Sequence, residues 1–254
     1  MAGAVEDASA RSEILPQDVL EAQALSMPSA LDAMAFLAPS AKVKIIAEIK
    51  RASPSRGALA SILDPAALGK SYESGGASAV SVLTEGRKFG GTLQDLISVR
   101  AAVQIPVLRK DFIALDYQVW EARAAGADMV LLIVAALTQP ELVRLYELIA
   151  SLGMTSLVET HSADEVSRAI DLGANLIGVN ARNLSTFELD QNLFTTLAEK
   201  IPSGIIRVAE SAVKTAADVA HYRRSGADVV LVGEALVTDG DPIRTLTEFL
   251  AVDA

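Results

Sequence analysis

The feature that most constrains the fold is an alternation, from about residue 41 onward, of short apolar runs with longer stretches of helical periodicity. Eight runs have the length and the apolar, often β-branched content of buried strands. Nearly continuous apolar strands separated by helices are typical of a parallel sheet that helices cover. The expected strands are Lys44–Lys50, Ala79–Leu83, Pro106–Lys110, Met129–Ile133, Thr155–Glu159, Leu176–Asn180, Ile206–Glu210 and Val229–Gly233.

A glycine-containing turn recurs before four of these runs. It reads Gly-Gly-Ala-Ser at 75–78, Ala-Gly-Ala-Asp at 125–128, Leu-Gly-Ala-Asn at 172–175 and Ser-Gly-Ala-Asp at 225–228. Glycine suits the left-handed residue that ends a helix. Eight such units in about 210 residues predict a closed (β/α)8 TIM barrel over residues 41–254. A doubly wound open sheet is the alternative, but it usually has fewer strands, and the sequence contains neither of the usual glycine-rich nucleotide-binding motifs.

Residues 1–40 differ from the rest of the chain. Pro16, Pro28 and Pro39 separate short helix-compatible segments there. We therefore expect a short N-terminal helical extension packed on the barrel, and a single catalytic domain after it.

The composition excludes several functional classes. The chain has 22 Lys and Arg against 32 Asp and Glu, a net charge of −10. This acidity argues against nucleic acid or an anionic membrane as a partner. Neither a long apolar segment nor a basic secretory leader is visible, so we expect a cytoplasmic protein. The absence of cysteine excludes disulfides, thiolate metal sites and a cysteine nucleophile, and with two histidines we expect no metal site.

Charged or polar residues end five of the eight runs. In such barrels the active site lies at the carboxyl ends of the strands. One charge there can simply reflect contact with water, but five on one rim predict a functional site. Alternate residues share a side of a strand, so Glu48 and Lys50 are predicted to point inward together, as are Asn180 and Arg182. The groups are Glu48 with Lys50, Arg109-Lys110-Asp111, Glu159, Asn180-Ala181-Arg182 and Glu210-Ser211.

The residue types at this rim suggest acid–base chemistry on an anion. Lys50, Lys110 and Arg182 predict a local anion site. Lys110 and Glu159 are candidates for general acid and general base, and burial together with nearby Lys50 predicts a lowered pKa for Lys110. The alternative for Lys110 is a salt bridge with a neighbouring strand-end carboxylate.

Three loops complete the expected site. The loops at 210–214 and 233–236 follow the last two strands, where barrels often bind phosphate through backbone N–H groups. Ser211 can contact phosphate or cap the next helix, and Gly233 permits close approach of the backbone. The loop at 51–57 is either a closing lid or a surface turn.

Six motifs resemble those of the indole-3-glycerol-phosphate synthase family of tryptophan biosynthesis, in order, between about Lys42 and Leu250. They are AEIKRASPSRG (47–57), PVLRKDF (106–112), YQVWEARAAGAD (117–128), LLIVAAL (131–137), GVNARNL (178–184) and VLVGEAL (230–236). The resemblance implies a carboxy-lyase that needs no metal or organic cofactor. Its substrate would be 1-(2-carboxyphenylamino)-1-deoxyribulose 5-phosphate, which loses CO₂ and water to give indole-3-glycerol phosphate.

The resemblance also implies roles for individual residues. Lys110 matches the general acid of ring closure and Glu159 its partner in dehydration. Glu48 and Asn180 match groups that orient these two, and Lys50 lies near the substrate's anionic groups. The implied catalytic set is Lys110, Glu159, Glu48, Lys50, Asn180 and Ser211, and the implied substrate contacts are Ser53, Phe89, Phe112, Leu131, Arg182, Leu184, Glu210, Leu231 and Gly233.

The chain departs from the family pattern at Ala212, where relatives usually have glycine. A positive φ at this alanine would cost roughly 1 kcal/mol, so we expect weaker phosphate affinity. Two alternatives remain open: a catalytically impaired barrel that binds a sugar phosphate, and phosphoribosylanthranilate isomerase, whose cysteine base this chain lacks. We expect a small substrate carrying phosphate and carboxylate as the partner, and a monomer, with a homodimer as the alternative.

Overall fold

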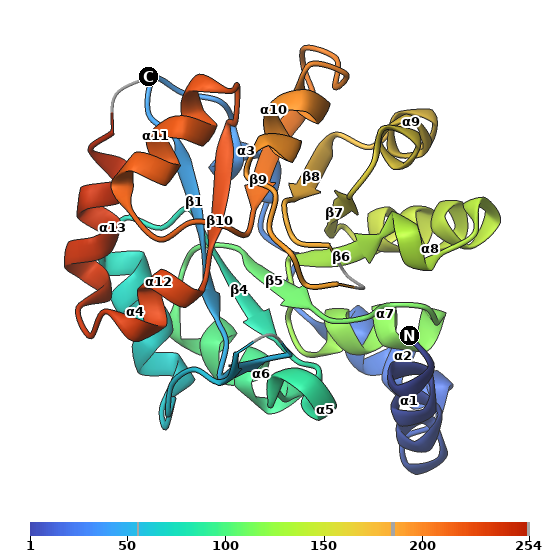
Figure 1. Ribbon diagram of the computed structural model, residues 1–254. Coiled ribbons are helices and arrows are strands. Elements are labelled where there is room, and N and C mark those ends of the chain that lie inside the picture. Colours follow the sequence, from blue (N-terminus) through green and yellow to red (C-terminus); the bar gives the residue numbers. More distant parts are fainter. Residues whose placement is uncertain (55, 184–185, 253–254) are drawn as a thin grey trace.

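The computed structural model describes residues 1–54, 56–183 and 186–252, and it contains a closed barrel of eight parallel strands (Figure 1). Each strand pairs with its neighbours in the chain, and β1 closes the ring by pairing with both β4 and β10. The predicted barrel is confirmed, and the open-sheet alternative is wrong. The strands are β1 (Lys44–Ile49), β4 (Ala79–Leu83), β5 (Val107–Lys110), β6 (Met129–Ile133), β7 (Thr155–Thr160), β8 (Leu176–Asn180), β9 (Ile206–Glu210) and β10 (Val229–Val232).

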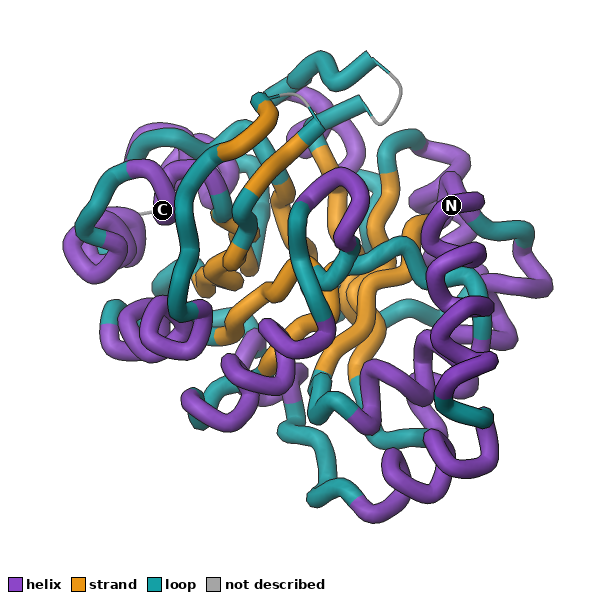
Figure 2. Tube along the Cα trace, turned by 90° about the horizontal axis from the view of Figure 1, so that it is seen from below, coloured by secondary structure: helices purple, strands orange, loops and turns teal. Residues whose placement is uncertain are grey.

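Helices surround the strands on the outside of the barrel (Figure 2). The four predicted glycine turns are confirmed, since Gly76, Gly126, Gly173 and Gly226 have φ of 94°, 86°, 81° and 93°. Within the described ranges, none of the helices is long and apolar enough to cross a membrane. After β1 they are α4 (Pro65–Ser74), α5 (Gly86–Phe89), α6 (Leu93–Ala102), α7 (Asp116–Ala124), η1 (Val134–Ala136), α8 (Gln139–Ser151), α9 (Ala163–Asp171), α10 (Asn192–Ala198), α11 (Ala216–Arg224), α12 (Glu234–Thr238) and α13 (Pro242–Leu250).

The strands supply two separate apolar layers because successive side chains point to opposite faces. Ile46, Leu108 and Leu157 are fully buried in the layer inside the barrel. Val80 and Val130 belong to the second layer, which lies between the strands and the outer helices. In β5 this alternation directs Leu108 and Lys110 inward and leaves Arg109 on the outer side.

The N-terminal extension consists of three helices, α1 (Ala2–Ile14), α2 (Gln17–Ser26) and α3 (Ala33–Leu37). Pro16 is the N-cap of α2, as expected from its position between helical segments. Helices α1 and α2 pack beside α7 (Figure 1). Ala33 and Leu37 of α3 are fully buried in the inner layer with Ile46, so α3 closes the barrel at the end opposite the strand carboxyl ends.

A buried ion cluster joins this extension to β5. The Arg109 side chain has no exposed surface, and its guanidinium lies 3.0 Å from Asp111, 3.3 Å from Glu121 and 2.7 Å from the backbone oxygen of Gln118. Arg11 of α1 binds the same Glu121 carboxylate at 2.5 and 2.8 Å. Buried charges are tolerated only when they are paired in this way. The cluster therefore holds α1, α7 and the strand that carries Lys110.

We expect the substitution Arg109→Met to destabilise the fold by about 3–5 kcal/mol, because it leaves Asp111 and Glu121 buried without this guanidinium. Urea denaturation followed by circular dichroism measures the change. Arg244→Met is the matched control, since Arg244 makes its ion pairs on an exposed face and its loss should leave the midpoint unchanged. Equal midpoints for the two variants would contradict the importance of the cluster.

Candidate active site

A cavity of about 430 Å³ opens at the carboxyl ends of the barrel strands. This volume suits a small-molecule ligand. Every site residue expected from the sequence lines the cavity except Leu184, which lies outside the described residues. Strand ends and the loops that follow them therefore converge as the barrel topology requires. The roles of these residues remain predictions.

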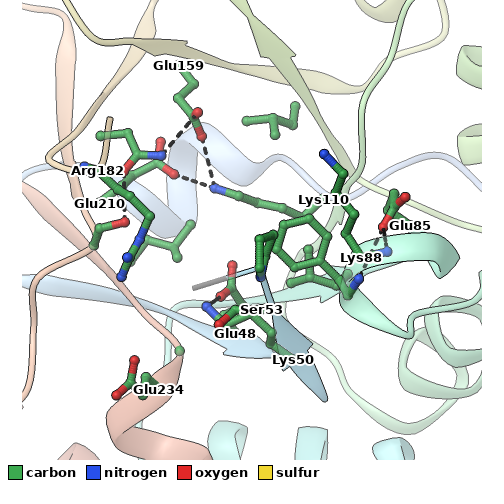
Figure 3. A pocket seen from close by; sticks show the side chains of 18 of the residues that line it. Glu48, Lys50, Ser53, Glu85, Lys88, Lys110, Glu159, Arg182, Glu210 and Glu234 are labelled. Carbon is green, nitrogen blue, oxygen red and sulfur yellow. Dashed lines mark hydrogen bonds and ion pairs between the residues drawn. The ribbon is translucent and has the colours of Figure 1, made fainter. Parts of the chain in front are cut away.

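Lys110 lies at the centre of the site between two buried carboxylates (Figure 3). Its ammonium is 3.2 Å from Glu159 and also pairs with Glu210. The side chains of Glu159 and Glu210 are only 2% and 1% exposed. Asn180 donates a hydrogen bond of 3.2 Å to the second oxygen of Glu159. One ammonium ion thus serves two carboxylates that have almost no contact with water.

The pKa of Lys110 is raised, so the prediction of a lowered value is wrong. Burial acts to lower the pKa of Lys110, but attraction by Glu210 and Glu159 outweighs it. Lys50 does not act as predicted either, because its ammonium is paired with Glu48 at 2.6 Å. Lys110 therefore makes the salt bridges that the sequence left as an alternative, and it carries a proton at neutral pH.

The two carboxylates beside Lys110 differ in proton affinity. Burial alone would raise the pKa of Glu159, but Lys110 and His161 hold it below its usual range. Burial raises the pKa of Glu210, and the negative charge of Glu159 adds to this effect. At neutral pH the geometry therefore favours an ionised Glu159 and a protonated Glu210 on either side of Lys110.

Two glycines make room for these charged side chains. A Cβ added to Gly178 would lie 2.2 Å from Oε1 of Glu210. A Cβ at Gly233 would lie 2.4 Å from Oε1 of Glu48 and 3.1 Å from the ammonium of Lys50. The predicted close approach at Gly233 is therefore observed, but it is the Glu48–Lys50 pair that fills the space.

One end of the cavity is aromatic and apolar. The ring centroids of Phe89 and Phe112 are 6.3 Å apart, and their planes are tilted by 49°. Leu131 and Leu231 line the same cavity. Such walls suit a planar aromatic group. Glu85, the N-cap of α5, positions Phe89, because its carboxylate accepts hydrogen bonds from the backbone N–H groups of Lys88 and Phe89.

The loop after β9 holds two residues in the left-handed region. Ser211 has φ of 69° and Ala212 has φ of 57°, so the expected strain at Ala212 is present and extends to its neighbour. Ser211 donates a hydrogen bond of 2.8 Å to Asn180. The N-cap of α11 is Thr215, so the alternative in which Ser211 is a plain helix cap is wrong.

The loop at 51–57 contains a short antiparallel hairpin, β2 (Ala52–Ser53) with β3 (Gly57–Ala58). Ser53, Pro54 and Arg56 line the cavity. Arg56 also lies 3.2 Å from Glu234, at the start of α12. The segment is thus part of the cavity wall and connects it to the loop after β10.

Sequence reasoning missed several residues at or near the site. Lys88 and Glu85 line the cavity from the loop after β4, and Lys214 lines it from the loop after β9. His161 lies directly behind Glu159. Each follows a predicted strand within a few positions, so the signal was present but was not used. In the part of the chain that the structure describes, no three acidic or histidine side chains are grouped so that they could hold a metal ion.

Comparison with known proteins identifies the family. A model of the family described as indole-3-glycerol phosphate synthase matches residues 1–249. The chain belongs to the indole-3-glycerol phosphate synthase family. A relative of that name from Leifsonia xyli subsp. xyli is 66% identical over 251 residues, which cover 99% of this chain and 96% of the relative. Another from Mycolicibacterium vanbaalenii is 55% identical and covers 99% of this chain and 92% of its own length.

Solved structures of other phosphate-handling enzymes share the barrel. A 3-hexulose-6-phosphate synthase matches 84% of this chain and 100% of its own with a TM-score of 0.66 and 18% identity. A thiamine phosphate pyrophosphorylase from Pyrococcus furiosus matches 82% of this chain and 93% of its own with a TM-score of 0.60 and 15% identity. At these identities the likeness extends to the fold alone. Membership of the indole-3-glycerol phosphate synthase family therefore rests on the sequence matches, which also disfavour the isomerase alternative.

We expect Ala212→Gly to stabilise this indole-3-glycerol phosphate synthase family member by about 1 kcal/mol, because glycine adopts a φ of 57° without the Cβ clash. The free energy of unfolding in urea measures the effect. The matched control Ala220→Gly, inside helix α11, should instead destabilise the protein by about 0.5–1 kcal/mol. Destabilisation by both substitutions would show that the backbone at 212 is not strained.

Proposed function

We propose that the protein closes the indole ring: it converts 1-(2-carboxyphenylamino)-1-deoxyribulose 5-phosphate into indole-3-glycerol phosphate, with loss of CO₂ and water, and is thus a carboxy-lyase. The observation that carries the proposal is the position of Lys110 between Glu159 and Glu210, in a cavity whose opposite ends suit an aromatic ring and a phosphate. The family membership supports the same reaction.

The cavity can take this substrate in one orientation. The aromatic ring fits against Phe89 and Phe112, and the phosphate fits the loop that carries Ser211 and Ala212. Lys214 follows that loop, and no carboxylate among the described residues lies within ion-pair distance of its ammonium. Lys88 lines the aromatic end of the cavity, beside the place where the substrate carboxylate would lie. Like Lys214, it makes no ion pair with a carboxylate among the described residues.

Ring closure requires an acid at the ribulose carbonyl. The aromatic carbon that bears the carboxylate bonds to the carbonyl carbon, and the carbonyl oxygen takes a proton from Lys110. The C–C bond to the carboxylate then breaks, CO₂ leaves, and its electron pair restores the aromatic ring. A raised pKa suits Lys110 to this role, because the residue enters the reaction with its proton in place.

Dehydration requires a base and an acid. The hydroxyl on the former carbonyl carbon leaves as water with a proton, and the adjacent CH₂ carbon loses a proton to a base. Ionised Glu159 suits the base, and Lys110, 3.2 Å away, can return a proton once it has been recharged. Glu210 accepts a hydrogen bond from charged Lys110 and has a raised pKa, so in its protonated form it is a proton source that can recharge Lys110. The whole sequence consumes one proton, because a carboxylate leaves as neutral CO₂.

Other residues support these steps. Asn180 orients Glu159 by its hydrogen bond and in turn accepts one from Ser211, which ties the phosphate loop to the catalytic carboxylate. Glu48 holds Lys50 at 2.6 Å, so Lys50 must exchange this partner for a substrate anion in order to bind it. We propose further that the reaction uses no metal or organic cofactor and occurs in the cytoplasm. We propose a monomer, with a homodimer as the alternative.

The second candidate function is a barrel that binds a sugar phosphate without turning it over. The strained Ser211–Ala212 loop favours it, because weakened phosphate binding would reduce turnover. The complete set of acid, base and orienting side chains around Lys110 favours the enzyme.

We expect the purified protein to produce indole fluorescence from the proposed substrate, and Lys110→Met to lower kcat about 10²–10⁴-fold, the usual contribution of a general acid. Lys70→Met, on the exposed side of α4, is the control and should retain wild-type kcat. Circular dichroism checks that both variants fold. Full activity in the Lys110 variant would reject its role, and tight binding without turnover by the wild type would favour the second candidate.

We expect Lys214→Gln to raise KM about tenfold with little change in kcat, because it removes a charge-assisted contact to the phosphate. Steady-state kinetics with the same substrate measure both constants. Lys200→Gln, in the exposed turn that follows α10, should leave KM unchanged. An equal KM in the two variants would place the phosphate away from Lys214.

A further inference from the structure

His161 follows β7 and lies behind Glu159, outside the cavity lining. Its side chain is 12% exposed, and Nε2 lies 3.2 Å from Oε1 of Glu159. Nε2 makes no hydrogen bond to any residue that the structure describes, so its contact with Glu159 is a charge interaction at ion-pair distance. Among the described residues, the carboxylate of the proposed catalytic base lies within ion-pair distance of this nitrogen.

The second ring nitrogen of His161 also faces a carboxylate. Nδ1 lies 3.1 Å from Oε2 of Glu165, and the same oxygen accepts the backbone N–H of His161 at 2.8 Å. The hydroxyl of Ser162 donates to Oε1 of Glu165 at 3.2 Å, which fixes this carboxylate in the first turn of α9. Nδ1 is at hydrogen-bond distance from one carboxylate and Nε2 is at ion-pair distance from another, so the negative charges on both sides of the ring favour the imidazolium ion.

The charges around the ring agree with this protonation state. Burial would lower the pKa of His161, but Glu159 and Glu165 together raise it to about 9. The groups that face Glu159 come from several elements. They are Lys110 from β5, Asn180 from β8, Glu210 from β9 and His161 from the end of β7, while Glu165 of α9 faces His161 from behind.

The proposed reaction creates a need for this second cation. When Lys110 gives its proton to the substrate, the ionised Glu159 loses the ammonium ion that balances its charge. A buried carboxylate without a counter-ion takes up a proton, and Glu159 could then no longer act as a base. His161 does not line the cavity, so its charge stays in place during that step.

We propose that His161 is a positioning residue for Glu159: as an imidazolium ion held by Glu165, it keeps the Glu159 carboxylate ionised and oriented while Lys110 is neutral. The proposal rests on the proposed ring-closure function and adds a residue to it. Glu165 has the indirect task of holding His161 charged.

The protonation state of His161 can be measured without turnover. The chain has two histidines, so in a His221→Gln variant ¹⁵N NMR of the imidazole reports His161 alone. We expect both nitrogens to be protonated at pH 7, with a titration midpoint at about pH 9. Glu165→Gln in the same background should lower the midpoint. A midpoint near the ordinary value of about 6.5 would overturn the proposal, whatever the enzyme's activity.

Kinetics test the effect on Glu159. His161→Gln removes a positive charge, which raises the pKa of Glu159, so the acid limb of the kcat/KM profile should move up by about one pH unit. His161→Lys keeps a cation and should leave this limb near its wild-type position, and the control His221→Gln should have no effect. If His161→Gln lowers kcat/KM equally at every pH, the role is structural and the proposal fails. If His161→Gln does not fold, the same pH profile is measured for Glu165→Gln. The acid limb of kcat/KM should again move to higher pH, and an unchanged acid limb overturns the proposal.

These outcomes remain distinct from those of the proposed function. Absence of turnover by the wild type would reject ring closure, while the NMR midpoint would still report whether His161 is held as an imidazolium ion beside Glu159.

Discussion

One ammonium ion shared by two buried carboxylates is the interaction on which the site depends. Lys110 pairs with both Glu159 and Glu210. Both carboxylates are buried, so water cannot take the place of Lys110 as their partner. A single positive charge cannot keep two such carboxylates ionised, so their proton affinities must separate. Glu159 accepts a hydrogen bond from Asn180 and has His161 at an ion-pair distance of 3.2 Å, whereas Oε1 of Glu210 has no hydrogen-bond partner among the described residues. The proton therefore belongs on Glu210, and the surroundings give the two carboxylates different proton affinities.

The barrel makes this arrangement possible because adjacent parallel strands end at one rim. Lys110, Glu159, Asn180 and Glu210 come from four different strands, and each is the last or next-to-last residue of its strand. The glycine at position 178 is also required, because the Glu210 carboxylate occupies the space that a Cβ at this position would fill. On the outer side of β5, the buried cluster of Arg109 supports the same strand.

Much of this could be predicted from the sequence, because strand periodicity and position along a strand determine both the barrel and the residues at its rim. The direction of the Lys110 pKa shift could not. It depends on whether the nearest charges are carboxylates or Lys50, and the sequence does not give distances between strands. The positive φ of Ser211 could not be predicted for a related reason. Serine has no preference for the left-handed region, so the loop imposes this strained conformation. His161 was overlooked because it lies one residue past a strand end and outside the cavity.

The ion pairs inside the cavity limit which lysines can bind a doubly anionic substrate. Acidic side chains line the cavity beside the basic ones, and Lys50 and Lys110 are already paired with glutamates. A paired cation must give up its partner to bind an anion, which offsets much of the gain. Lys88 and Lys214 have no ion pair to break among the described residues. They lie at the two ends of the cavity, where the substrate carboxylate and the phosphate would bind. In the proposed reaction, attraction and chemistry are therefore divided: Lys88 and Lys214, which make no ion pair within the described residues, attract the substrate, and the paired Lys110 moves the proton.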